Sequence, residues 1–569
     1  MANPFLSVLA AYSRIAKHRL IRQTRQVEAA QARFLLTLLR HHQGTEVGQR
    51  FHLEEICSVE QFRDRIPILP YSFYEPYAQR IARGETNVLC PDPVRYMSWT
   101  SGSTGKQKIV PVTQRFQASL AKSNVASMGF LLSALQSYAP HVSDGQPFGQ
   151  LLSANSVQVQ GYTEAGIPFG PVTVGSLRMG KQFYSQVIAH PYQTLTLGDS
   201  LARHYVGLLF ALRTPHLRGM AANFPMLILR ICDYLATYSE SLIADLAQGT
   251  LASWLQIEPG LRAWLERRCR PFPQRAAQLQ AIVKAEGRLT PKTAWPDFSY
   301  VLTARGGTSD FYFQNFPEFF GDAPIFGGVY GAAEATFGVY ADVNADGSIL
   351  ALESGFYEFV PSDQWAVEQP RTLMPSEVQV GQRYRILVTS YSGFYRYDIG
   401  DVVEVVGFYE QAPLIVFRHR QGGFISSTTE KTTEFHVTQV MQQLQAAFQL
   451  RLDDFCVTLS ADVIPAAYLV NIELGAGHTL ANPEDFLAKF DHLLSEVNHP
   501  YGAARRDQIP SPRLRLLAPG SFTTVRQRQV AKGMSDSQLK FPHISEDRHF
   551  LDGLALEQEF RLAAEGGAA

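Results

Sequence analysis

Hydroxyl and glycine residues alternate in one short segment whose composition suits the binding of an anion, Thr100-Ser101-Gly102-Ser103-Thr104-Gly105. Glycines let the backbone turn its N–H groups toward one point, and the hydroxyls add hydrogen-bond donors. Lys106 and Lys108 follow and add positive charge. The segment is not a Walker A loop, because Gln107 stands where that motif requires Ser or Thr. It predicts a polyphosphate site, although alone it is also typical of an exposed turn.

Two later segments place an acidic residue beside an apolar run. The first is Gly328-Val329-Tyr330-Gly331-Ala332-Ala333-Glu334, and its carboxylate suits a Mg²⁺ ion that keeps several waters and binds phosphate oxygens. A solvated glutamate at the end of a strand is the alternative interpretation. The second is Gly393–Asp401, in which Asp401 precedes an apolar strand and suits the two hydroxyls of a ribose. Asp398 is an alternative for that role, and a turn acid is a further interpretation of either residue.

Two lysines complete the set of candidate residues. Lys431 lies in Thr429-Glu430-Lys431-Thr432, and Lys540 lies in Ser537-Gln538-Leu539-Lys540-Phe541-Pro542. A lysine at either place is ordinarily a solvated surface residue. Their interest comes from their order along the chain relative to the loop and the acids.

In that order, the segments resemble the motifs of the adenylate-forming superfamily, and most closely those of the Gretchen-Hagen-type acyl-acid amido synthetases. That family conjugates auxin, jasmonate and benzoates to amino acids in plants. The family's phosphate loop, S-S-G-T-S-x-G-x-x-K-x-x-P, is followed from Thr100 through Lys108 and Pro111. The other matching segments are Pro67–Glu85, Tyr330–Glu334, Val388–Val403, Phe417–Glu434, Gly520-Ser521-Phe522 and Gln538–Pro542.

The sequence departs from the family pattern at two of these segments. Ala333 replaces a serine of the Y-x-x-S-E motif, and His543 replaces an arginine near the end of the chain. The resemblance otherwise covers nearly the whole chain. It is weakest between Phe116 and Trp295, where the family's acyl-acid pocket lies.

The resemblance implies a role for each candidate residue. An ATP site would contain Thr100, Ser101, Gly102, Ser103, Thr104, Gly307, Tyr330, Gly331, Glu334, Asp401, Lys431 and Lys540. Within it, Ser101, Ser103 and Thr104 would bind the β- and γ-phosphates, Glu334 would hold Mg²⁺, and Asp401 would hold the ribose. Gly307 would lie along the adenine, and Lys431 would contact ATP near the lobe junction. Lys540 would stabilise the α-phosphoryl transition state, so that Lys540 and Glu334 are the expected catalytic residues.

The implied reaction has two steps. A carboxylic acid would first react with ATP to give an acyl-adenylate and pyrophosphate, and an amine, typically of an amino acid, would then form an amide and release AMP. ATP and Mg²⁺ are therefore the expected cofactors, and a small carboxylic acid and an amine are the expected partners. Transfer to CoA or to a carrier-protein thiol is an alternative, as is a catalytically silent protein that binds nucleotide or a small acid.

The acid itself is not identified by the sequence. Asn124, Ser127 and Met128 lie in a helical region where their side chains could line an acyl pocket, and helix packing is an equally good interpretation of them. Aromatic and fatty acids both remain possible substrates.

Helices interleaved with short strands are predicted to position these residues. Helical patterns cover the opening segment, in which Leu6, Leu9, Tyr12 and Ile15 share one stripe, and the range 114–135. From about Tyr300 short strands follow, including one run at 326–330. The predicted fold class is α/β, that of the adenylate-forming enzymes, with β-sheets flanked by helices in the large domain and a small mobile α+β domain.

We expect the domain boundary at residue 420. Residues 1–420 would form the domain that binds ATP and the acid, and residues 421–569 the small domain that carries Lys540. In the small domain a helix at 434–448 is followed by strands at 455–459 and 468–474, a helix that begins at Pro483, and a final strand at 514–517.

Composition excludes several other classes of protein. The 569 residues carry a formal charge of −1, with 46% hydrophobic and 18% charged residues, as in an ordinary globular chain. This charge gives no attraction to nucleic acid or to an anionic membrane. No apolar run approaches the roughly 20 residues that span a bilayer. The five cysteines are scattered and odd in number, which favours a reducing compartment. We expect a cytoplasmic monomer that binds neither nucleic acid nor membranes.

Overall fold

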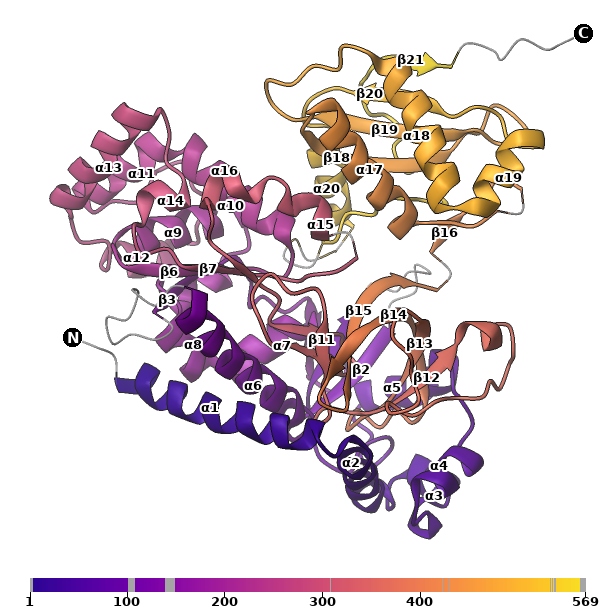
Figure 1. The fold of residues 1–569 in the computed structure, drawn as a ribbon. Coiled ribbons are helices and arrows are strands. Elements are labelled where there is room, and N and C mark those ends of the chain that lie inside the picture. Colours follow the sequence, from indigo (N-terminus) through magenta and orange to yellow (C-terminus); the bar gives the residue numbers. More distant parts are fainter. Residues whose placement is uncertain are drawn as a thin grey trace, which may run out of the picture. The chain divides into compact units, whose positions relative to one another are not determined.

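A computed structural model describes residues 4–100, 108–138, 149–307, 309–421, 423–428, 430–532, 534, 536 and 539–562 (Figure 1). The chain forms two compact units. Unit 1 comprises Met1–Gly306 and Phe316–Phe417, and unit 2 comprises Gly307–Asn315 and Arg418–Ala569. The short segment Gly307–Asn315 thus belongs to unit 2, and the chain passes into unit 2 for the second time between Phe417 and Arg418. The boundary at residue 420 stays a prediction.

Helices make up most of the first 300 residues of unit 1. Those before residue 140 are α1 (Pro4–Thr24), α2 (Val27–His42), α3 (Glu46–Arg50), η1 (Leu53–Glu55), α4 (Val59–Arg65), α5 (Tyr71–Ala82) and α6 (Gln114–Tyr138). The later ones are α7 (Val172–Met179), α8 (Lys181–Val187), η2 (Tyr192–Thr196), α9 (Ser200–Leu212), α10 (Pro225–Thr237), α11 (Ser239–Gln248), α12 (Pro259–Glu266), α13 (Pro273–Glu286), α14 (Pro291–Ala294), α16 (Phe316–Phe320) and η3 (Ser362–Gln364).

Helix α1 packs along α6, and their close approach corrects one prediction (Figure 1). A Cβ atom at Gly129 of α6 would lie 2.2 Å from the carbonyl oxygen of Ser13, so only glycine fits there. The buried face of α1 therefore includes Ser13 together with Leu6 and Leu9. Tyr12 and Ile15, which the sequence placed on the same stripe, are 59% and 66% exposed.

Three sheets form the framework of unit 1. One is parallel, in the order β3 (Gln150–Ser153), β6 (Leu217–Ala221), β7 (Tyr300–Leu302) and β8 (Ile325–Phe326). A second has the order β2 (Lys108–Thr113), β1 (Val94–Thr100), β5 (Pro168–Gly170) and β4 (Gly161–Tyr162). The third has the order β12 (Phe356–Pro361), β13 (Arg383–Thr389), β14 (Tyr397–Tyr409), β15 (Ala412–Arg420), β11 (Ser348–Leu350), β10 (Thr336–Tyr340) and β9 (Val329–Gly331).

The predicted run at 326–330 is wrong as a single strand. It forms the ends of two strands, β8 in the parallel sheet and β9 in the seven-stranded sheet. The chain changes sheet at Gly327 and Gly328, where Gly328 has a φ of +66° and a Cβ at Gly327 would lie 2.5 Å from the Tyr340 ring. Glycine pairs permit such a turn between strands, and the turn carries the chain from one sheet to Tyr330 in the next.

Unit 2 contains a mixed sheet, with both antiparallel and parallel pairs of strands, and helices that pack on it. The sheet has the order β18 (Leu452–Leu459), β19 (Tyr468–Leu474), β20 (Arg513–Leu517) and β21 (Leu556–Arg561). The remaining elements are α15 (Ser309–Phe313), β16 (Phe424–Ile425), β17 (Thr432–Thr433), α17 (Glu434–Phe448), α18 (Pro483–Val497), α19 (His499–Asp507) and α20 (Ser521–Ala531). The predicted helix at 434–448 is confirmed, but β20 is not the final strand, because β21 pairs with it.

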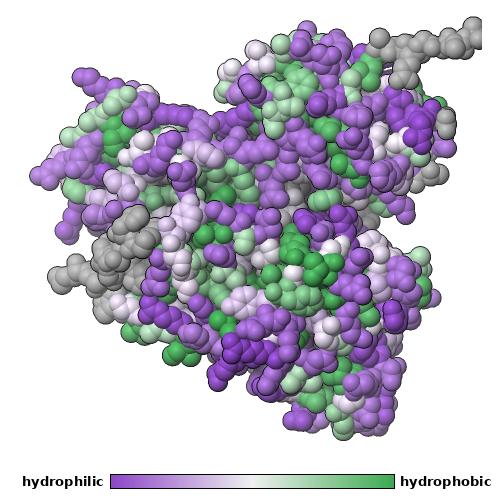
Figure 2. Space-filling model, viewed as in Figure 1, coloured by the Kyte–Doolittle hydropathy of each residue, from purple (hydrophilic) through white to green (hydrophobic). Residues whose placement is uncertain are grey.

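The protein surface is mostly hydrophilic on the face drawn in Figure 2, where apolar side chains occur in small groups. Among the described residues, no helix has the length and apolar character needed to cross a bilayer. The mixture of helices with parallel and antiparallel strands confirms the predicted α/β class.

Candidate active site

Two of the predicted ATP-site residues, Tyr330 and Asp401, meet in unit 1. The Tyr330 hydroxyl donates a hydrogen bond of 2.7 Å to the Asp401 carboxylate, and Asp401 is 2% exposed. The Tyr330 ring stacks on Phe337 at 5.1 Å between centroids and lies 5.7 Å from the Phe417 ring. Packing against Phe337 and Phe417 thus orients the Tyr330 hydroxyl toward the Asp401 carboxylate.

An irregularity in β14 gives Asp401 its place in the sheet. Against β13, Arg385 pairs with Val402 and Leu387 pairs with Asp398, so residues between Asp398 and Val402 have no regular partners. Gly400, within this bulge, has a φ of +81°. Bulges of this kind change the direction of side chains and are common beside active sites. The sequence signal was the glycine directly before Asp401.

Asp398, the alternative ribose residue, already has charged and backbone partners. Its carboxylate lies 3.1 Å from Arg385 Nε and accepts a hydrogen bond of 2.9 Å from the Gly400 N–H. Burial raises the pKa of Asp398 above its ordinary value, and Arg385 opposes that rise. These contacts give Asp398 a structural function in the bulge, which favours Asp401 over Asp398 as a ligand residue.

The aromatic segment before these acids is anchored to the N-terminal helices. The Tyr74 hydroxyl of α5 donates a hydrogen bond of 2.6 Å to the Tyr395 carbonyl oxygen and accepts one of 2.8 Å from the Tyr395 N–H. The Tyr395 hydroxyl lies 3.0 Å from His42 Nδ1 of α2. Arg396 forms a buried ion pair of 2.8 Å with Glu358. A Cβ at Gly393 would lie 2.4 Å from the Leu89 carbonyl oxygen, so the tight packing here requires glycine.

Glu334 lies in the turn between β9 and β10 and is 3% exposed. Ser390 Oγ donates a hydrogen bond of 2.7 Å to its carbonyl oxygen and so fixes the turn. The pKa of Tyr71 is raised to about 12, mainly by burial and then by the negative charges of Glu75 and Glu334. The Glu334 carboxylate is therefore buried within electrostatic reach of the Tyr71 hydroxyl.

Lys108 joins this group from the end of the glycine-rich loop. Its Nζ donates a hydrogen bond of 3.0 Å to the Tyr397 hydroxyl and lies 5.6 Å from the centre of the Tyr71 ring. Lys108 was expected to add positive charge to the loop, whereas Tyr71 and Tyr397 were not among the predicted site residues. The signals for them were present, because all three lie within the segments that carry the family resemblance.

The glycine-rich loop itself lies between two paired strands. Thr100 at the end of β1 pairs with Lys108 at the start of β2. Ser101, Gly102, Ser103 and Thr104 lie outside the described residues, as does the Thr100 side chain. The described part establishes that a β-hairpin brackets the loop, and that its Lys108 end reaches Tyr71.

Gly307 lies in a turn that contains two glycines in the left-handed conformation. Gly306 and Gly307 have φ values of +82° and +61°, and a Cβ at Gly306 would lie 3.0 Å from the Phe417 carbonyl oxygen. Arg305, which precedes them, forms an ion pair of 2.6 Å with Asp346. Only glycine takes these two conformations without strain, which accounts for the Arg305-Gly306-Gly307 sequence.

The three candidate acyl-pocket residues of α6 have different surroundings. Ser127 is buried and donates a hydrogen bond of 2.8 Å to the Gly328 carbonyl oxygen, just before β9. Asn124 is exposed and bonds within its own helix to the Leu120 carbonyl oxygen. Met128 packs against the apolar cluster that contains Leu6 and Leu9. Helix packing accounts for Met128, whereas Ser127 lies next to the segment that leads to Tyr330.

The two lysines belong to unit 2. Lys431 is exposed, with its Nζ 5.2 Å from the centre of the Phe424 ring. Glu430, directly before it, is buried and accepts hydrogen bonds from the Ser427 and Thr428 N–H groups. Lys540 is 39% exposed and forms an ion pair of 3.0 Å with Glu434.

His543, where the related family has arginine, is fully buried in unit 2. Its ring stacks on Phe455 at 4.1 Å, and its Nε2 lies 3.2 Å from Asp454. Tyr312 of α15 donates to the same Asp454 carboxylate at 3.2 Å. The histidine thus has a packing function that fixes the segment after Lys540. Ala333, the other departure, is buried beside Glu334.

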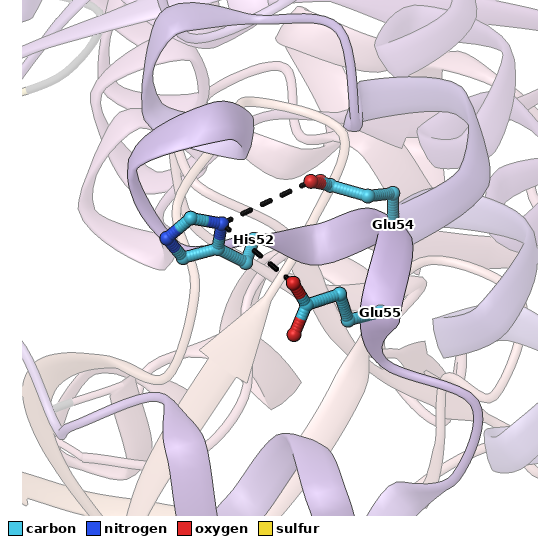
Figure 3. A group of neighbouring side chains, drawn as sticks. All are labelled: His52, Glu54 and Glu55. Carbon is cyan, nitrogen blue, oxygen red and sulfur yellow. Dashed lines mark ion pairs between the residues drawn. The ribbon is translucent and has the colours of Figure 1, made fainter.

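A separate group of possible metal ligands consists of His52, Glu54 and Glu55 (Figure 3). All three are exposed, and His52 Nδ1 lies 3.9 Å from each carboxylate. Glu55 also forms an ion pair of 2.9 Å with Arg65. Surface ion pairing explains this group, which does not include the predicted magnesium ligand Glu334.

The fold is that of the adenylate-forming enzymes. An acyl acid amido synthetase structure, described as AtGH3.15 in complex with 2,4-DB, aligns with a TM-score of 0.85 and 22% identity, over 96% of this chain and 97% of that one. A 2-hydroxyisobutyryl-CoA ligase in the postadenylation state aligns with a TM-score of 0.52 and 12% identity, over 93% and 89% of the two chains. At these identities the likeness concerns the fold alone.

Family models then identify the chain more closely. The GH3 family N-terminal domain matches residues 16–325, the central domain matches 348–420 and the C-terminal domain matches 435–549. The chain belongs to the GH3 family, and the resemblance seen in the motifs is confirmed.

Curated relatives cover nearly the full chain. Indole-3-acetic acid-amido synthetase GH3.17 of Arabidopsis thaliana is 26% identical over 91% of both chains. Probable indole-3-acetic acid-amido synthetase GH3.2 of Oryza sativa subsp. japonica is 25% identical over 91% of this chain and 88% of its own.

Proposed function

We propose that this protein is an ATP-dependent acyl-acid amido synthetase. The observation that carries the proposal is its full-length similarity to curated amido synthetases of the GH3 family, combined with retention of the motif acids. Glu334 and Asp401 are both buried, and Asp401 is held by Tyr330. Lys540, whose proposed role lies in the adenylation step itself, is also retained, which favours an active enzyme over a silent binding protein.

The first step converts the acid into a better acyl donor. A carboxylate oxygen of the acid attacks the α-phosphorus of ATP, the bond to the bridging oxygen of the β-phosphate breaks, and pyrophosphate leaves with the electron pair. The protein contributes by aligning the reactants and neutralising charge. Ser101, Ser103 and Thr104 are proposed to bind the β- and γ-phosphates, with Thr100 and Gly102 in the same loop. Lys540 is proposed to donate to the α-phosphoryl oxygens as charge develops there.

The nucleoside would be held by residues of the turn and the bulge. Asp401 is proposed to accept the ribose hydroxyls, with Tyr330 and Gly331 beside it and Gly307 along the adenine. Support for Asp401 comes from its contact with a tyrosine hydroxyl, whereas Asp398 is paired with Arg385. Lys431 is proposed to contact ATP from unit 2.

Magnesium fits the donor chemistry of Glu334. A single buried carboxylate is the kind of protein ligand that Mg²⁺ uses when phosphates and waters complete its coordination. The ion would neutralise phosphate charge when bound. Glu334 would hold it, and the Ser390 hydrogen bond keeps the Glu334 turn in place.

The second step joins the acyl group to an amine. The amine nitrogen attacks the acyl carbon, the bond to the AMP oxygen breaks, and AMP leaves while the nitrogen loses a proton. The relatives are named indole-3-acetic acid-amido synthetases, which supports amide formation and a small carboxylic acid as the donor. The acceptor amine is proposed to belong to an amino acid. Residues 1–420 and 421–569 would act as a large domain and a mobile small domain, with the hinge near Arg418–Gln421.

The remaining expectations also belong to this proposal. A cytoplasmic location is supported by five free thiols, of which four are buried. We also propose a monomer that binds neither nucleic acid nor membranes, and the near-neutral charge supports the second part of that expectation. Size-exclusion chromatography with light scattering would test the oligomeric state.

A pyrophosphate-release screen tests the adenylation step. Purified protein is incubated with ATP and Mg²⁺ and a panel of aromatic, indolic, jasmonate-like and fatty acids, each without an amine. Release that depends on a particular acid supports the proposal and identifies the acid class. If the whole panel fails to raise release above the acid-free control, the silent binding protein is the better interpretation.

A further inference from the structure

Glu434 places its two carboxylate oxygens on two parts of the segment that carries Lys540. One oxygen lies 3.0 Å from Lys540 Nζ, and the other accepts a hydrogen bond of 2.9 Å from the backbone N–H of His543. The Glu434 side chain is 20% exposed and the Lys540 side chain is 39% exposed. One residue therefore contacts both the ammonium group and the backbone three residues beyond it.

The position of Glu434 favours a charged carboxylate. It is the first residue of α17, where helix N–H groups attract negative charge, and it follows the N-cap residue Thr433, whose N–H donates a hydrogen bond of 3.2 Å to His436 Nδ1. Burial alone would raise the pKa of Glu434. The charges of Lys540 and His543 and the His543 N–H outweigh burial, so that its pKa is held below the ordinary range. The carboxylate is consequently ionised at neutral pH.

The backbone around Lys540 is fixed by contacts other than this ion pair. The His543 ring is buried against Phe455, and the His543 carbonyl accepts a hydrogen bond of 2.8 Å from the Val457 N–H. Phe541 packs edge-on against Phe522 at 4.9 Å, and Leu539 is 2% exposed. Because these contacts secure the backbone, the distinct contribution of the Glu434 charge is the direction of the Lys540 side chain.

We propose that Glu434 is the positioning residue of Lys540, and that it holds the ammonium group in the orientation needed for adenylation. This inference rests on the proposed function. A long lysine side chain loses considerable rotamer freedom when it acts at one point, and an ion pair formed in advance removes part of that loss from the reaction. Glu434 does not contact the reacting atoms in this account, since it acts through Lys540.

The test is a double-mutant cycle on acid-dependent pyrophosphate release. Glu434→Gln keeps the shape and the oxygen that accepts the His543 N–H, but it removes the charge that faces Lys540. We expect kcat to fall about 10- to 100-fold with little change in the KM for ATP. In a Lys540→Ala background the same substitution should have no further effect, because its partner is absent. Glu484→Gln, in the exposed first turn of α18, is the matched control.

Two further measurements separate positioning from folding. Glu434→Asp keeps the charge on a shorter side chain and should recover part of the rate that Glu434→Gln loses. Thermal unfolding and aminolysis of a synthetic acyl-adenylate should remain near the wild-type values in both variants, because Lys540 is needed in the first step.

Three outcomes would overturn the inference. One is an unchanged or raised kcat in Glu434→Gln, and another is an equal loss in the Lys540 and Lys540→Ala backgrounds. The third is a wild-type protein that releases no pyrophosphate with any acid, because the proposed function then fails and the inference fails with it. Adenylation by the wild type together with full activity of Glu434→Gln removes only the inference.

Discussion

Asp401 in unit 1 and Lys540 in unit 2 are held by different kinds of interaction. Asp401 is 2% exposed and receives a hydrogen bond from Tyr330, whose ring is stacked on Phe337. Lys540 is 39% exposed and pairs with the Glu434 carboxylate. A buried neutral donor holds its acceptor with little sensitivity to salt, whereas a partly exposed ion pair is weakened by salt.

This difference in burial corresponds to the proposed role of each residue. Asp401 would hold the nucleotide through both steps, so a fixed position is an advantage. Lys540 would act in adenylation alone. Its partly exposed ammonium group has three N–H donors, so it can donate to phosphate oxygens while it stays in contact with Glu434, without the cost of opening a core. Burial thus keeps Asp401 in one position, whereas exposure leaves Lys540 accessible to the phosphate for a single step.

Replacing Lys540 with Ala gives the largest expected effect. The rate of acid-dependent pyrophosphate release should fall about 100- to 1000-fold, because a donor to the developing charge is lost. ATP binding, measured by calorimetry, should persist because the other proposed contacts remain. Lys489→Ala, an exposed lysine of α18, is the control. A normal rate of pyrophosphate exchange in Lys540→Ala would show that Lys540 does not stabilise the transition state of adenylation.

Replacing Asp401 with Ala should act on binding rather than on rate. The KM for ATP should rise about 10- to 100-fold, since a hydrogen bond to a charged group is lost. The matched variant is Asp398→Ala, which leaves Arg385 without its carboxylate and should reduce stability while the KM changes little. If Asp398→Ala shows the rise in KM and Asp401→Ala does not, the assignment of the two acids is reversed.

The pH dependence of the free energy of unfolding tests whether the buried His42 side chain of unit 1 stays uncharged. Burial lowers the pKa of His42 from 6.5 to about 3, while His42 contacts the Tyr395 hydroxyl. The unfolded chain binds a proton at this residue below pH 6.5 and the folded chain does not, so stability falls as pH falls from 6.5 toward 3. Between pH 7.5 and 5 the loss is about 2 kcal/mol.

Replacing His42 with Gln should flatten that acid dependence. Urea unfolding of the wild type and the variant, measured at several pH values between 5 and 8, gives the two slopes. His18→Gln, at an exposed position of α1, should keep the wild-type slope. Equal slopes for His42→Gln and the wild type would mean that His42 takes up its proton in the folded protein as readily as in the unfolded chain.

The smallest expected effect is that of Tyr330→Phe. The ring and its stacking remain, and only the hydroxyl that donates to Asp401 is removed. The KM for ATP should rise about 3- to 10-fold, less than in Asp401→Ala, and kcat should stay near the wild-type value. A fall in kcat with an unchanged KM would separate Tyr330 from nucleotide binding and weaken the contrast between the units.

Much of the fold was predictable because periodicity reports burial. The helix at 434–448 has Val437, Val440, Met441 and Leu444 on one face, and all four are fully buried. The pattern failed at α1, where Gly129 lets α6 approach Ser13 so closely that the buried face shifts away from Tyr12. That shift depends on a partner helix more than 100 residues away, which local patterns do not contain.

The site was predictable to the extent that motifs mark single residues. Asp401 and Tyr330 were identified from separate segments, but their hydrogen bond depends on the bulge in β14 and on the change of sheet at Gly327-Gly328. Tyr71 and Tyr397 were missed because their relation to Lys108 arises only when α5, β2 and β14 pack together. Glu434 was assigned to a helix and to the segment Phe417–Glu434 but was given no role, since its contact with Lys540 spans 106 residues.

Product analysis in a single competitive incubation tests the central claim most directly. The protein, ATP, Mg²⁺ and an acid that supports pyrophosphate release are incubated with an equimolar mixture of amino acids and CoA, and the products are measured by mass spectrometry. We expect AMP in equal amount to one or a few acyl–amino acid amides, with both lost in Lys540→Ala. An acyl-CoA thioester in place of the amides would contradict it, as would the absence of any acyl product.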